Sequence, residues 1–331
     1  MLNAAVIGLG WWGQTIVRML EGSPKIRLIR VMTRSRAGTE LAEARALAIS
    51  TEYRDVLRDP AVEAVILCTP HSTHLDLVRE AAHARKHVFC EKPLALTRRD
   101  AEAAIAACNA AGVTLGIGHE RRFEPAILEL RRRVERGELG TLLQLEATFS
   151  QDKFLALDPG NWRFSSIEAP AGPLTGTGIH LLDLAISFLG PMERLFASVK
   201  HLSGHMANGD TLAILAVFKS GAQALFGASL ATPFDGRFAL YGREGWADMR
   251  DLSHPEAPSG MTLTLCHKGG RRECLDFAPS ASVRANLEAF ADAATGKSPY
   301  PMSQQEMLWN IAALEAVSQS AASGRVEAVE S

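Results

Sequence analysis

The chain has 331 residues, 47% of them hydrophobic, and a formal net charge of −2 with both signs interspersed. This length predicts two domains or one large α/β domain, and the balanced charge argues against a nucleic-acid or membrane-surface partner. No apolar run approaches the roughly 20 residues that a bilayer span needs. The five cysteines show no C-x-x-C spacing, so we expect reduced thiols and a cytoplasmic location.

The first motif lies at the N-terminus, where an apolar run at residues 5–7 meets the pattern G-x-G-x-x-G. An amphipathic segment follows, and the order strand, tight turn, helix predicts a dinucleotide-binding loop. Gly8 permits the turn, Gly10 lets the backbone approach a diphosphate, and Gly13 lets the helix pack on the strand. The diphosphate would bind N–H groups at the helix N-terminus. Because the motif starts within the first ten residues, we expect no signal peptide.

Three further residues of this loop are predicted cofactor contacts, namely Leu9, Trp11 and Trp12. The two indoles could cover the diphosphate or the adenine side of the nucleotide. The alternative is that they pack against the second domain.

Strands and helices alternate as far as residue 118. Strands are predicted at 26–32, 62–68, 87–90 and 113–118, and helices at 39–48, 72–86 and 97–111. We expect Thr97 to cap the last helix, with Gly112 beyond its end. Ser72 or Thr73 is placed to cap the helix before it. Strands separated by helices predict right-handed crossovers and a doubly wound parallel sheet of the Rossmann type.

The end of the second strand bears on which dinucleotide binds. An NAD site usually carries Asp or Glu about 20 residues past the glycine loop, where it binds the ribose 2′-hydroxyl. Thr33 stands there instead, and no acidic residue occurs from 26 to 39. Thr33, Arg34 and Ser35 offer hydrogen bonds and positive charge to a 2′-phosphate, which predicts NADP(H) as the preferred cofactor. Alternatively, Arg34 and Arg36 form a solvated loop, and NAD binds without the acid.

The pattern changes after about residue 120. A helix is predicted at 125–136, with Pro in its first turn. Strands then dominate, at 142–149, 195–202, 211–219, 222–230, 237–241, 246–250, 262–267 and 272–277. Short turns between several of them predict antiparallel hairpins. Helices at 283–295 and 304–322 end the chain, the second with a capping box formed by Ser303 and Glu306.

The two patterns predict two domains. We expect a nucleotide-binding domain at 1–120 and, at 121–331, an α+β domain with a large, mainly antiparallel sheet. The C-terminal helix could pack back on the first domain. A ligand cleft is expected where the two domains meet.

Four segments, together with the glycine loop, carry a family resemblance. They are C-T-P-H-S-T-H at 68–74, H-V-F-C-E-K-P-L at 87–94, R-R-F at 121–123 and G-T-G-I-H-L-L-D at 176–183. With them the chain resembles, over nearly its whole length, the Gfo/Idh/MocA oxidoreductases, relatives of glucose–fructose oxidoreductase and inositol dehydrogenase. The resemblance implies that the first domain binds NAD(P). It implies that the second domain supplies an open sheet that covers the substrate and often makes the subunit interface.

Lys92 is the first candidate catalytic residue. It follows a buried strand at the carboxyl edge of the sheet, where doubly wound proteins bind ligands, and Pro93 keeps it extended. An ammonium near a substrate oxygen stabilises the alkoxide charge that develops during hydride transfer. The alternative is a surface lysine paired with Glu91. The resemblance implies that Lys92 lies near the nicotinamide and the substrate.

His180 is the second candidate. It opens an apolar helical stretch, and Asp183 follows three residues on, along the same helix face. An imidazole at a cleft can take the proton from an alcohol as hydride leaves its carbon, or return it in the reverse direction. A single histidine near an apolar helix is often structural. The resemblance implies a proton-transfer or substrate-contacting role.

The sequence departs from the family pattern at two positions. The family commonly has Asp four residues before this histidine, where the chain has Gly176. Either Thr175 or Thr177 substitutes through its hydroxyl, or substrate and mechanism differ from polyol oxidation. His119 stands where a tyrosine is common before the R-R-F segment.

The remaining site residues complete two sets. On the nicotinamide side the predicted cofactor contacts are Cys68, Thr69, Pro70, His71, His74, Glu91 and Lys92. The predicted substrate contacts are Lys92, His119, Arg122, Trp162, Arg163, Thr177, His180 and Asp183. Several of these could equally be core, interface or solvated residues. Neither the Cys68, His71, His74 triplet nor the pair His201 and His205 has further ligands at zinc spacing, so no metal is expected.

These residues predict an oxidoreductase that transfers a hydride between NADP(H), or NAD, and a CH–OH or C=O carbon. The substrate is expected to be small, polar and sugar- or cyclitol-like. A nucleotide-binding sensor without turnover, and a glycosidase-type relative that holds NAD, are the alternatives. A long antiparallel sheet needs its open face covered, which predicts a homo-oligomer, either dimer or tetramer.

Overall fold

The computed structural model describes residues 1–254 and 259–330 and divides into two compact units. The first unit comprises Met1–Glu120 and Ala281–Met307, and the second comprises Arg121–Ser280 and Leu308–Ser331. The chain passes from the first unit to the second after Glu120, and residues 281–307 return to the first unit.

The first unit contains a parallel sheet of six strands among the described residues, in the order β3-β2-β1-β4-β5-β6. Its strands are β1 (Leu2–Ile7), β2 (Ile26–Met32), β3 (Ala48–Ser50), β4 (Ala64–Leu67), β5 (His87–Cys90) and β6 (Leu115–Ile117). β4 is buried along its whole length, as expected for a parallel strand covered on both faces. The strand order reverses between β1 and β4, and ligands of doubly wound sheets bind at such a point. The predicted fold of this domain is confirmed.

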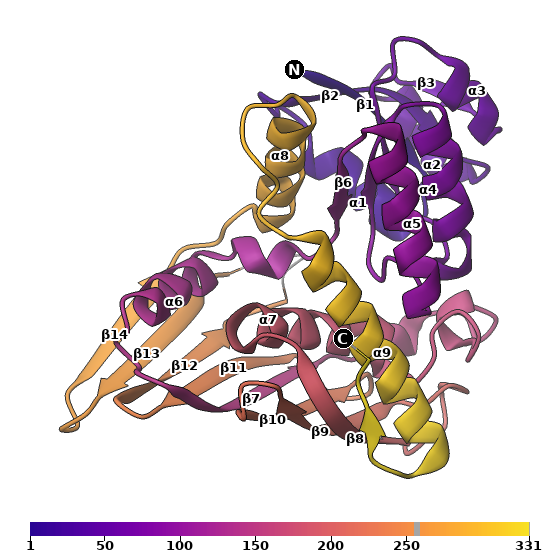
Figure 1. Cartoon of the computed structure of the whole chain (residues 1–331). Coiled ribbons are helices and arrows are strands. Elements are labelled where there is room, and N and C mark those ends of the chain that lie inside the picture. The colour runs from indigo at the N-terminus through magenta and orange to yellow at the C-terminus, as the bar shows by residue number, and fades with distance from the viewer. Residues whose placement is uncertain (255–258, 331) are drawn as a thin grey trace. The chain divides into compact units, whose positions relative to one another are not determined.

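Helices cover both faces of this sheet. They are α1 (Trp11–Met19), α2 (Arg36–Glu43), α3 (Tyr53–Arg58), α4 (His74–His83), α5 (Arg98–Ala111) and α8 (Ser282–Ala294). Right-handed crossovers run in opposite directions from β1 and β4, so their helices lie on opposite faces (Figure 1). α8 comes from far along the chain and packs on the sheet through Phe290, whose ring centroid lies 5.6 Å from that of Phe89.

Some helix boundaries differ from those predicted. Thr97 accepts a hydrogen bond from the backbone N–H of Asp100, and Gly112 ends the helix at φ 67°, both as expected. The helix expected at 39–48 begins earlier, because Ser35 caps it through Gly38 N–H, and β3 occupies its predicted end. Thr73 makes no capping bond to α4, since its hydroxyl donates to Pro70 O instead.

The second unit is built on a mixed, mostly antiparallel sheet, with the described strands in the order β14-β13-β12-β11-β7-β10-β9-β8-β15. The strands are β7 (Leu142–Ser150), β8 (Met192–Lys200), β9 (Thr211–Phe218), β10 (Gln223–Ser229), β11 (Asp235–Gly242), β12 (Gly245–Asp251), β13 (Met261–His267), β14 (Arg272–Phe277) and β15 (Glu327–Ala328). β10 pairs parallel with β7, and the other neighbours are antiparallel. The predicted sheet is confirmed, although β15 was not anticipated.

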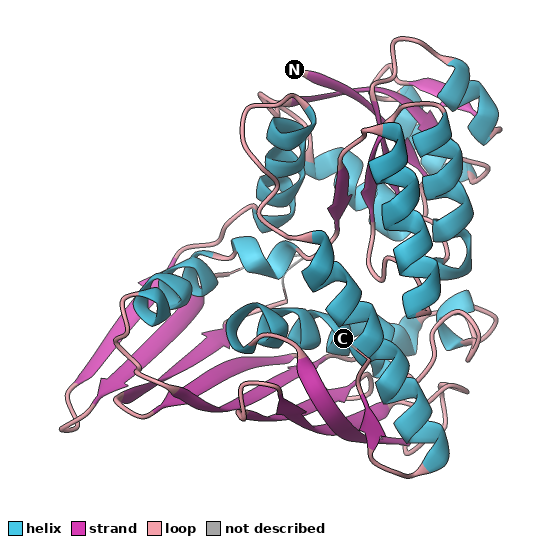
Figure 2. Cartoon of the chain, in the orientation of Figure 1, coloured by secondary structure: helices cyan, strands magenta, loops and turns pink. Residues whose placement is uncertain are grey.

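One face of this sheet carries the core of the second unit. In Figures 1 and 2, α6 (Pro125–Glu135), α7 (Ile179–Leu189) and α9 (Gln304–Ser323) lie along that face. Alternate residues of β9, from Leu212 to Phe218, are buried against them, and the residues between point outward. Ser303 and Glu306 form the expected capping box at the start of α9.

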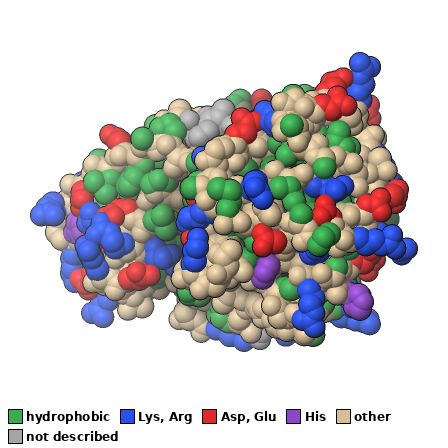
Figure 3. Space-filling view, turned by 90° about the horizontal axis from the view of Figure 1, so that it is seen from above, with side chains coloured by type: hydrophobic (Ala, Val, Ile, Leu, Met, Phe, Trp, Pro, Cys, Tyr) green, Lys and Arg blue, Asp and Glu red, His purple; other side chains and the backbone are tan. Residues whose placement is uncertain are grey.

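Charge is distributed as the composition suggested. On the face shown in Figure 3, basic and acidic side chains are interspersed among apolar and uncharged ones. Among the described residues, no helix has the length and apolar character needed to cross a membrane.

Candidate functional site

The glycine loop joins β1 to α1 and has room for a ligand at one position only. Gly8 has φ +90°, and a Cβ there would lie 2.7 Å from Cys68 O. A Cβ at Gly13 would collide with the carbonyl of Gly8, so helix and turn are in backbone contact. A Cβ at Gly10 would meet no atom within 4 Å. The space over Gly10 thus fits a diphosphate at the start of α1, whose first turn holds no acidic residue.

The two tryptophans of the loop have different environments. The side chain of Trp11 is 49% exposed, whereas Trp12 is half-buried against the apolar core of the first unit. Their ring centroids lie 5.8 Å apart. Trp11 is therefore the indole with surface left to cover a bound nucleotide.

The end of β2 presents hydroxyl groups and no carboxylate. Thr33 is buried, and its Oγ1 lies 3.2 Å from Oγ of Ser35. Gly38 allows α2 to approach closely, because a Cβ there would lie 2.5 Å from Thr33 Oγ1. Arg34 is 70% exposed and makes a long ion pair of 3.4 Å with Glu52, so its guanidinium can reorient toward an anion at little cost.

The side chain of His74 contacts two segments of the candidate site. This completely buried imidazole lies with Nδ1 2.7 Å from Pro93 O and Nε2 3.1 Å from Thr69 O. It thereby links the turn after β4 to the turn after β5 that carries Lys92. Within the 68–74 turn, the ring of His71 lies 5.8 Å from that of His74. Both turns leave the carboxyl edge of the sheet, as does the glycine loop.

Glu91 is a buried carboxyl group beside Lys92. It accepts a hydrogen bond of 3.4 Å from the backbone N–H of Lys92, and a Cβ at Gly118 would lie 2.5 Å from its Oε2. Burial raises the pKa of Glu91 to about 8, with a further rise from Glu120 and a partial offset from Trp12 and Lys92. The absence of a side chain at Gly118 therefore leaves the space that the Glu91 carboxyl group occupies. The sequence indicated Glu91 but gave no sign of its partner Glu120.

His180 stands at the start of α7, directly after a π-helical turn at Leu174–Gly178. Such turns are frequent at functional sites. The imidazole is buried, and its ring centroid lies 6.1 Å from that of Phe149 on β7. Thr177 is fully buried, and its hydroxyl donates to Pro173 O at 3.1 Å.

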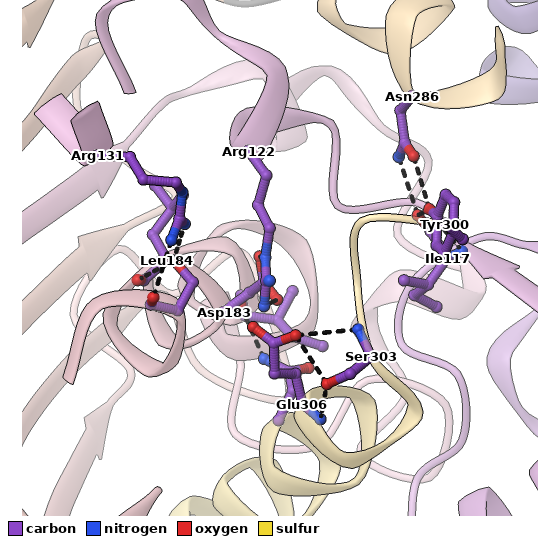
Figure 4. A network of polar contacts seen from close by, with 12 residues as sticks. Ile117, Arg122, Arg131, Asp183, Leu184, Asn286, Tyr300, Ser303 and Glu306 are labelled. Carbon is purple, nitrogen blue, oxygen red and sulfur yellow. Dashed lines mark hydrogen bonds and ion pairs between the residues drawn. The ribbon is translucent and has the colours of Figure 1, made fainter. Parts of the chain in front are cut away.

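Arg122 and Asp183 form a bidentate ion pair (Figure 4), with distances of 2.8 and 2.7 Å. Both side chains are buried. Asp183 lies one helical turn after His180 and thus fixes Arg122 beside α7. The two predicted substrate residues therefore contact each other.

Arg121, the first residue of the R-R-F segment and a candidate to line the substrate cleft, is also buried. It binds Glu124 at 3.2 Å and Asp251 at 2.7 Å, and its guanidinium carbon lies 5.2 Å from the Phe149 ring centroid. Glu124 and Asp251 lie 3 and 130 residues away in sequence, so the contact with Asp251 can be recognised only from the fold.

The other predicted substrate residues are more scattered. Trp162 and Arg163 lie in a separate 3-10 turn and stack on each other, with the guanidinium 4.3 Å from the ring. His119 is buried at the end of the first unit. Within the described part of the chain, no group of three His, Cys, Asp or Glu residues could hold a metal ion.

Comparisons with known proteins identify the family of this chain. Residues 2–119 match the oxidoreductase family model with an NAD-binding Rossmann fold, and residues 127–248 match the GFO/IDH/MocA C-terminal domain. Scyllo-inositol 2-dehydrogenase (NAD(+)) of Bacillus subtilis is 31% identical over 76% of this chain and 75% of its own. D-xylose 1-dehydrogenase (NADP(+)) 2 of Haloferax volcanii is 28% identical over 85% and 88%.

A solved structure has the same fold over the whole length. The aldose-aldose oxidoreductase of Caulobacter crescentus, complexed with glycerol, matches with a TM-score of 0.87 at 26% identity, covering 99% of each chain. Both halves of the chain therefore have the architecture that their motifs implied. The chain belongs to the Gfo/Idh/MocA family of NAD(P)-dependent oxidoreductases.

Proposed function

We propose that the protein transfers a hydride between NADP(H), with NAD as a weaker substitute, and a CH–OH or C=O carbon of a small sugar- or cyclitol-like molecule. The observation that carries this proposal is the joining of three segments at one sheet edge: the glycine loop, the 68–74 turn and the Lys92 turn. His74 bonds the last two directly.

The glycine loop and the α1 N-terminus would hold the diphosphate, and the 68–74 and 91–92 turns would border the nicotinamide. When bound, the nicotinamide supplies or accepts the hydride. Lys92 then holds its ammonium at the substrate oxygen, where it stabilises negative charge as the C–O bond changes order. His180 takes the hydroxyl proton on a ring nitrogen in oxidation and returns it in reduction.

Preference for NADP(H) is supported by the end of β2. A carboxylate there would repel a 2′-phosphate, whereas Thr33, Ser35 and Arg34 offer two hydroxyls and a mobile guanidinium. The N-terminus of α2 adds a favourable dipole.

A second copy of the chain is proposed to cover the open sheet face. Phe196, Leu215 and Leu225 point outward on adjacent strands, and each is paired in register with the next. They are 38%, 46% and 47% exposed, which makes a continuous apolar row. Rows of this kind usually mark an interface.

The test is direct observation of hydride transfer. The purified chain is mixed with NADPH deuterated at the hydride position and with a panel of keto-sugars and keto-cyclitols, and products are analysed by mass spectrometry. We expect deuterium on a carbinol carbon of at least one product. Tight nucleotide binding without any labelled product would indicate a sensor, and cleavage of a chromogenic glycoside without net cofactor use would indicate the glycosidase-type chemistry.

A further inference from the structure

The carboxyl group of Glu91 is buried directly after β5, at the carboxyl edge of the first unit's sheet. Within the described part of the chain it takes part in one hydrogen bond, the 3.4 Å contact from the backbone N–H of Lys92. A carboxylate removed from water stays ionised only where strong donors or a close cation replace that water. One long hydrogen bond does not replace it, so burial favours the protonated form.

The side chain of Glu120 places a second carboxyl group beside the first. Both side chains are buried. Gly118 lies two residues before Glu120, and because a Cβ there would be 2.5 Å from Oε2 of Glu91, this segment is in direct contact with the Glu91 carboxyl. The charge of Glu120 is the second cause, after burial, of the pKa of about 8 at Glu91. Two carboxyl groups that share a buried site do not both ionise at neutral pH, so the pair holds one proton.

Further titratable groups act on this pair from its own turn and from the neighbouring strands. The ammonium of Lys92 lowers the pKa of Glu91, by less than burial raises it. Burial, with a contribution from Glu91, raises the pKa of the Cys68 and Cys90 thiols well above their usual range. Both thiols are therefore uncharged at neutral pH, and the proton that can leave this edge of the sheet is the one on the two carboxyl groups.

A donor for the ionised form of Glu91 is present in the glycine loop. The indole of Trp12 acts on Glu91 by lowering its pKa. Its Nε1 is buried and has no hydrogen-bond acceptor among the described residues. A buried N–H without an acceptor is unfavourable, so the indole favours the carboxylate once the proton has left. The nucleotide-binding loop and the carboxyl pair are thus in electrostatic contact.

We propose that Glu91 and Glu120 form a proton site that responds to the oxidation state of the bound nucleotide. Binding of the oxidised nucleotide releases the shared proton to the solvent, and binding of the reduced nucleotide leaves it in place. This inference rests on the proposed function and adds a pH-dependent control of nucleotide affinity to the same site.

The physical reason is charge balance beside Lys92. The oxidised nicotinamide ring is positively charged, whereas the reduced ring is neutral. An opposite charge within about 4–6 Å lowers the pKa of a carboxyl group by about 1–3, so the oxidised ring favours the ionised pair. When an alcohol then gives up its hydride, the positive charge on the ring is lost and the pair takes up one proton again. The proton that the alcohol hydroxyl releases in the same reaction balances this uptake.

The sign of the pH dependence follows from this linkage. Between the pKa of Glu91 in the oxidised complex and its value of about 8 in the free chain, binding of NADP⁺ releases a proton, so the affinity rises with pH. Above about 8 the carboxyl is already ionised and the rise ends. Between pH 6.5 and 8.5 we expect the Kd for NADP⁺ to fall about tenfold relative to the Kd for NADPH.

The experiment measures both constants and counts the protons. Calorimetric titrations with NADP⁺ and with NADPH are run across this pH range, and at pH 7 in buffers that differ in ionisation enthalpy. We expect NADP⁺ to release about half a proton or more per nucleotide at pH 7, and NADPH to release almost none. Taking the ratio of the two constants cancels the titration of the 2′-phosphate, which both nucleotides carry.

Three variants locate the proton. Glu91→Gln cannot ionise, so it should remove the pH dependence of the ratio. Glu120→Gln keeps the Glu91 carboxyl but removes the neighbouring charge, and it should move the rise in NADP⁺ affinity to lower pH. Glu43→Gln, at an exposed position, is the matched control and should behave as the parent chain.

The outcomes separate this inference from the proposed function. Equal pH dependence and equal proton release for the two nucleotides overturn the inference alone. A difference that survives Glu91→Gln, or a rise that Glu120→Gln does not move, also overturns it. Should Glu91→Gln fail to fold, the proton count of the parent chain and the shift in Glu120→Gln decide. Binding of neither nucleotide at any pH overturns the proposed function and the inference with it.

Discussion

At the scale of single residues, the pKa of Glu91 gives a pH-dependent prediction. Its folded-state pKa is about 8, against an ordinary value of 4.5, chiefly because the carboxyl is buried. Between these values the folded chain keeps a proton that the unfolded chain releases, so stability falls as the pH rises, by at most about 1.4 kcal/mol per pH unit. Above the folded-state pKa this loss levels off.

Glu91→Gln removes this titration while keeping the shape of the side chain. Thermal melts from pH 5.5 to 8.5 should therefore show a smaller decline in Tm for the variant than for the parent chain. Glu43→Gln, at an exposed position, is the control and should follow the parent. Parallel curves for all three proteins would show that the Glu91 carboxyl does not hold its proton in the folded state.

Arg34 yields a prediction about cofactor choice. Arg34→Ala should weaken NADPH binding by about tenfold and leave NADH binding unchanged, since a charge-assisted contact to the 2′-phosphate is lost. Arg36→Ala, on an arginine that is 93% exposed and pairs with Glu40, is the control. Titration by nucleotide fluorescence measures both constants. If Arg34→Ala weakened the binding of NADPH and of NADH equally, the role of Arg34 in binding the 2′-phosphate would be refuted.

At the scale of elements, substitutions at two glycines of the glycine loop should have separate effects on folding stability and on NADPH binding. Gly10→Ala places a methyl in open space and should leave Tm nearly unchanged, but it should weaken NADPH binding by about 100-fold because the diphosphate needs that space. Gly13→Ala forces a collision between α1 and the turn and should cost about 1–3 kcal/mol of folding stability. Calorimetry and nucleotide titration test both. Loss of folding stability in Gly10→Ala, together with loss of NADPH affinity alone in Gly13→Ala, would contradict these roles of the two glycines.

The sequence correctly predicted features that depend on residues close together in the chain. The glycine loop, the Thr97 cap and the Ser303–Glu306 box each depend on residues a few positions apart, and all three appear as predicted. The helix expected at 39–48 is present, but its predicted bounds were wrong, because Ser35, assigned to the cofactor, also caps the helix and starts it early.

The sequence pattern could not predict contacts between residues that lie far apart in the chain. Nothing near Phe154 in sequence indicates that its ring covers Gly176, 22 positions on, or that Arg121 meets Asp251. The π-helical turn before His180 has no sequence signature of its own. The helix α8 was expected from the sequence, but the packing of its Phe290 in the core of the first unit was not.

At the scale of the whole molecule, the outer sheet face predicts self-association. The apolar row of Phe196, Leu215 and Leu225 should be covered by a second copy, so light scattering after size exclusion should give at least the dimer mass. Leu215→Glu should shift the mass to the monomer, because a charge cannot be buried there without a partner. Leu128→Glu, on the exposed side of α6, is the control. A parent chain of monomer mass would refute this assembly.

The central claim is that Lys92 and His180, drawn from the two units, act on one substrate molecule. A double-mutant cycle with Lys92→Met and His180→Gln, read as kcat with NADPH affinity measured separately, tests it most directly. We expect each variant to lose about 100-fold or more in kcat at unchanged NADPH affinity, and the double variant to be scarcely slower than either one. Fully additive losses, or an active single variant, would contradict the account.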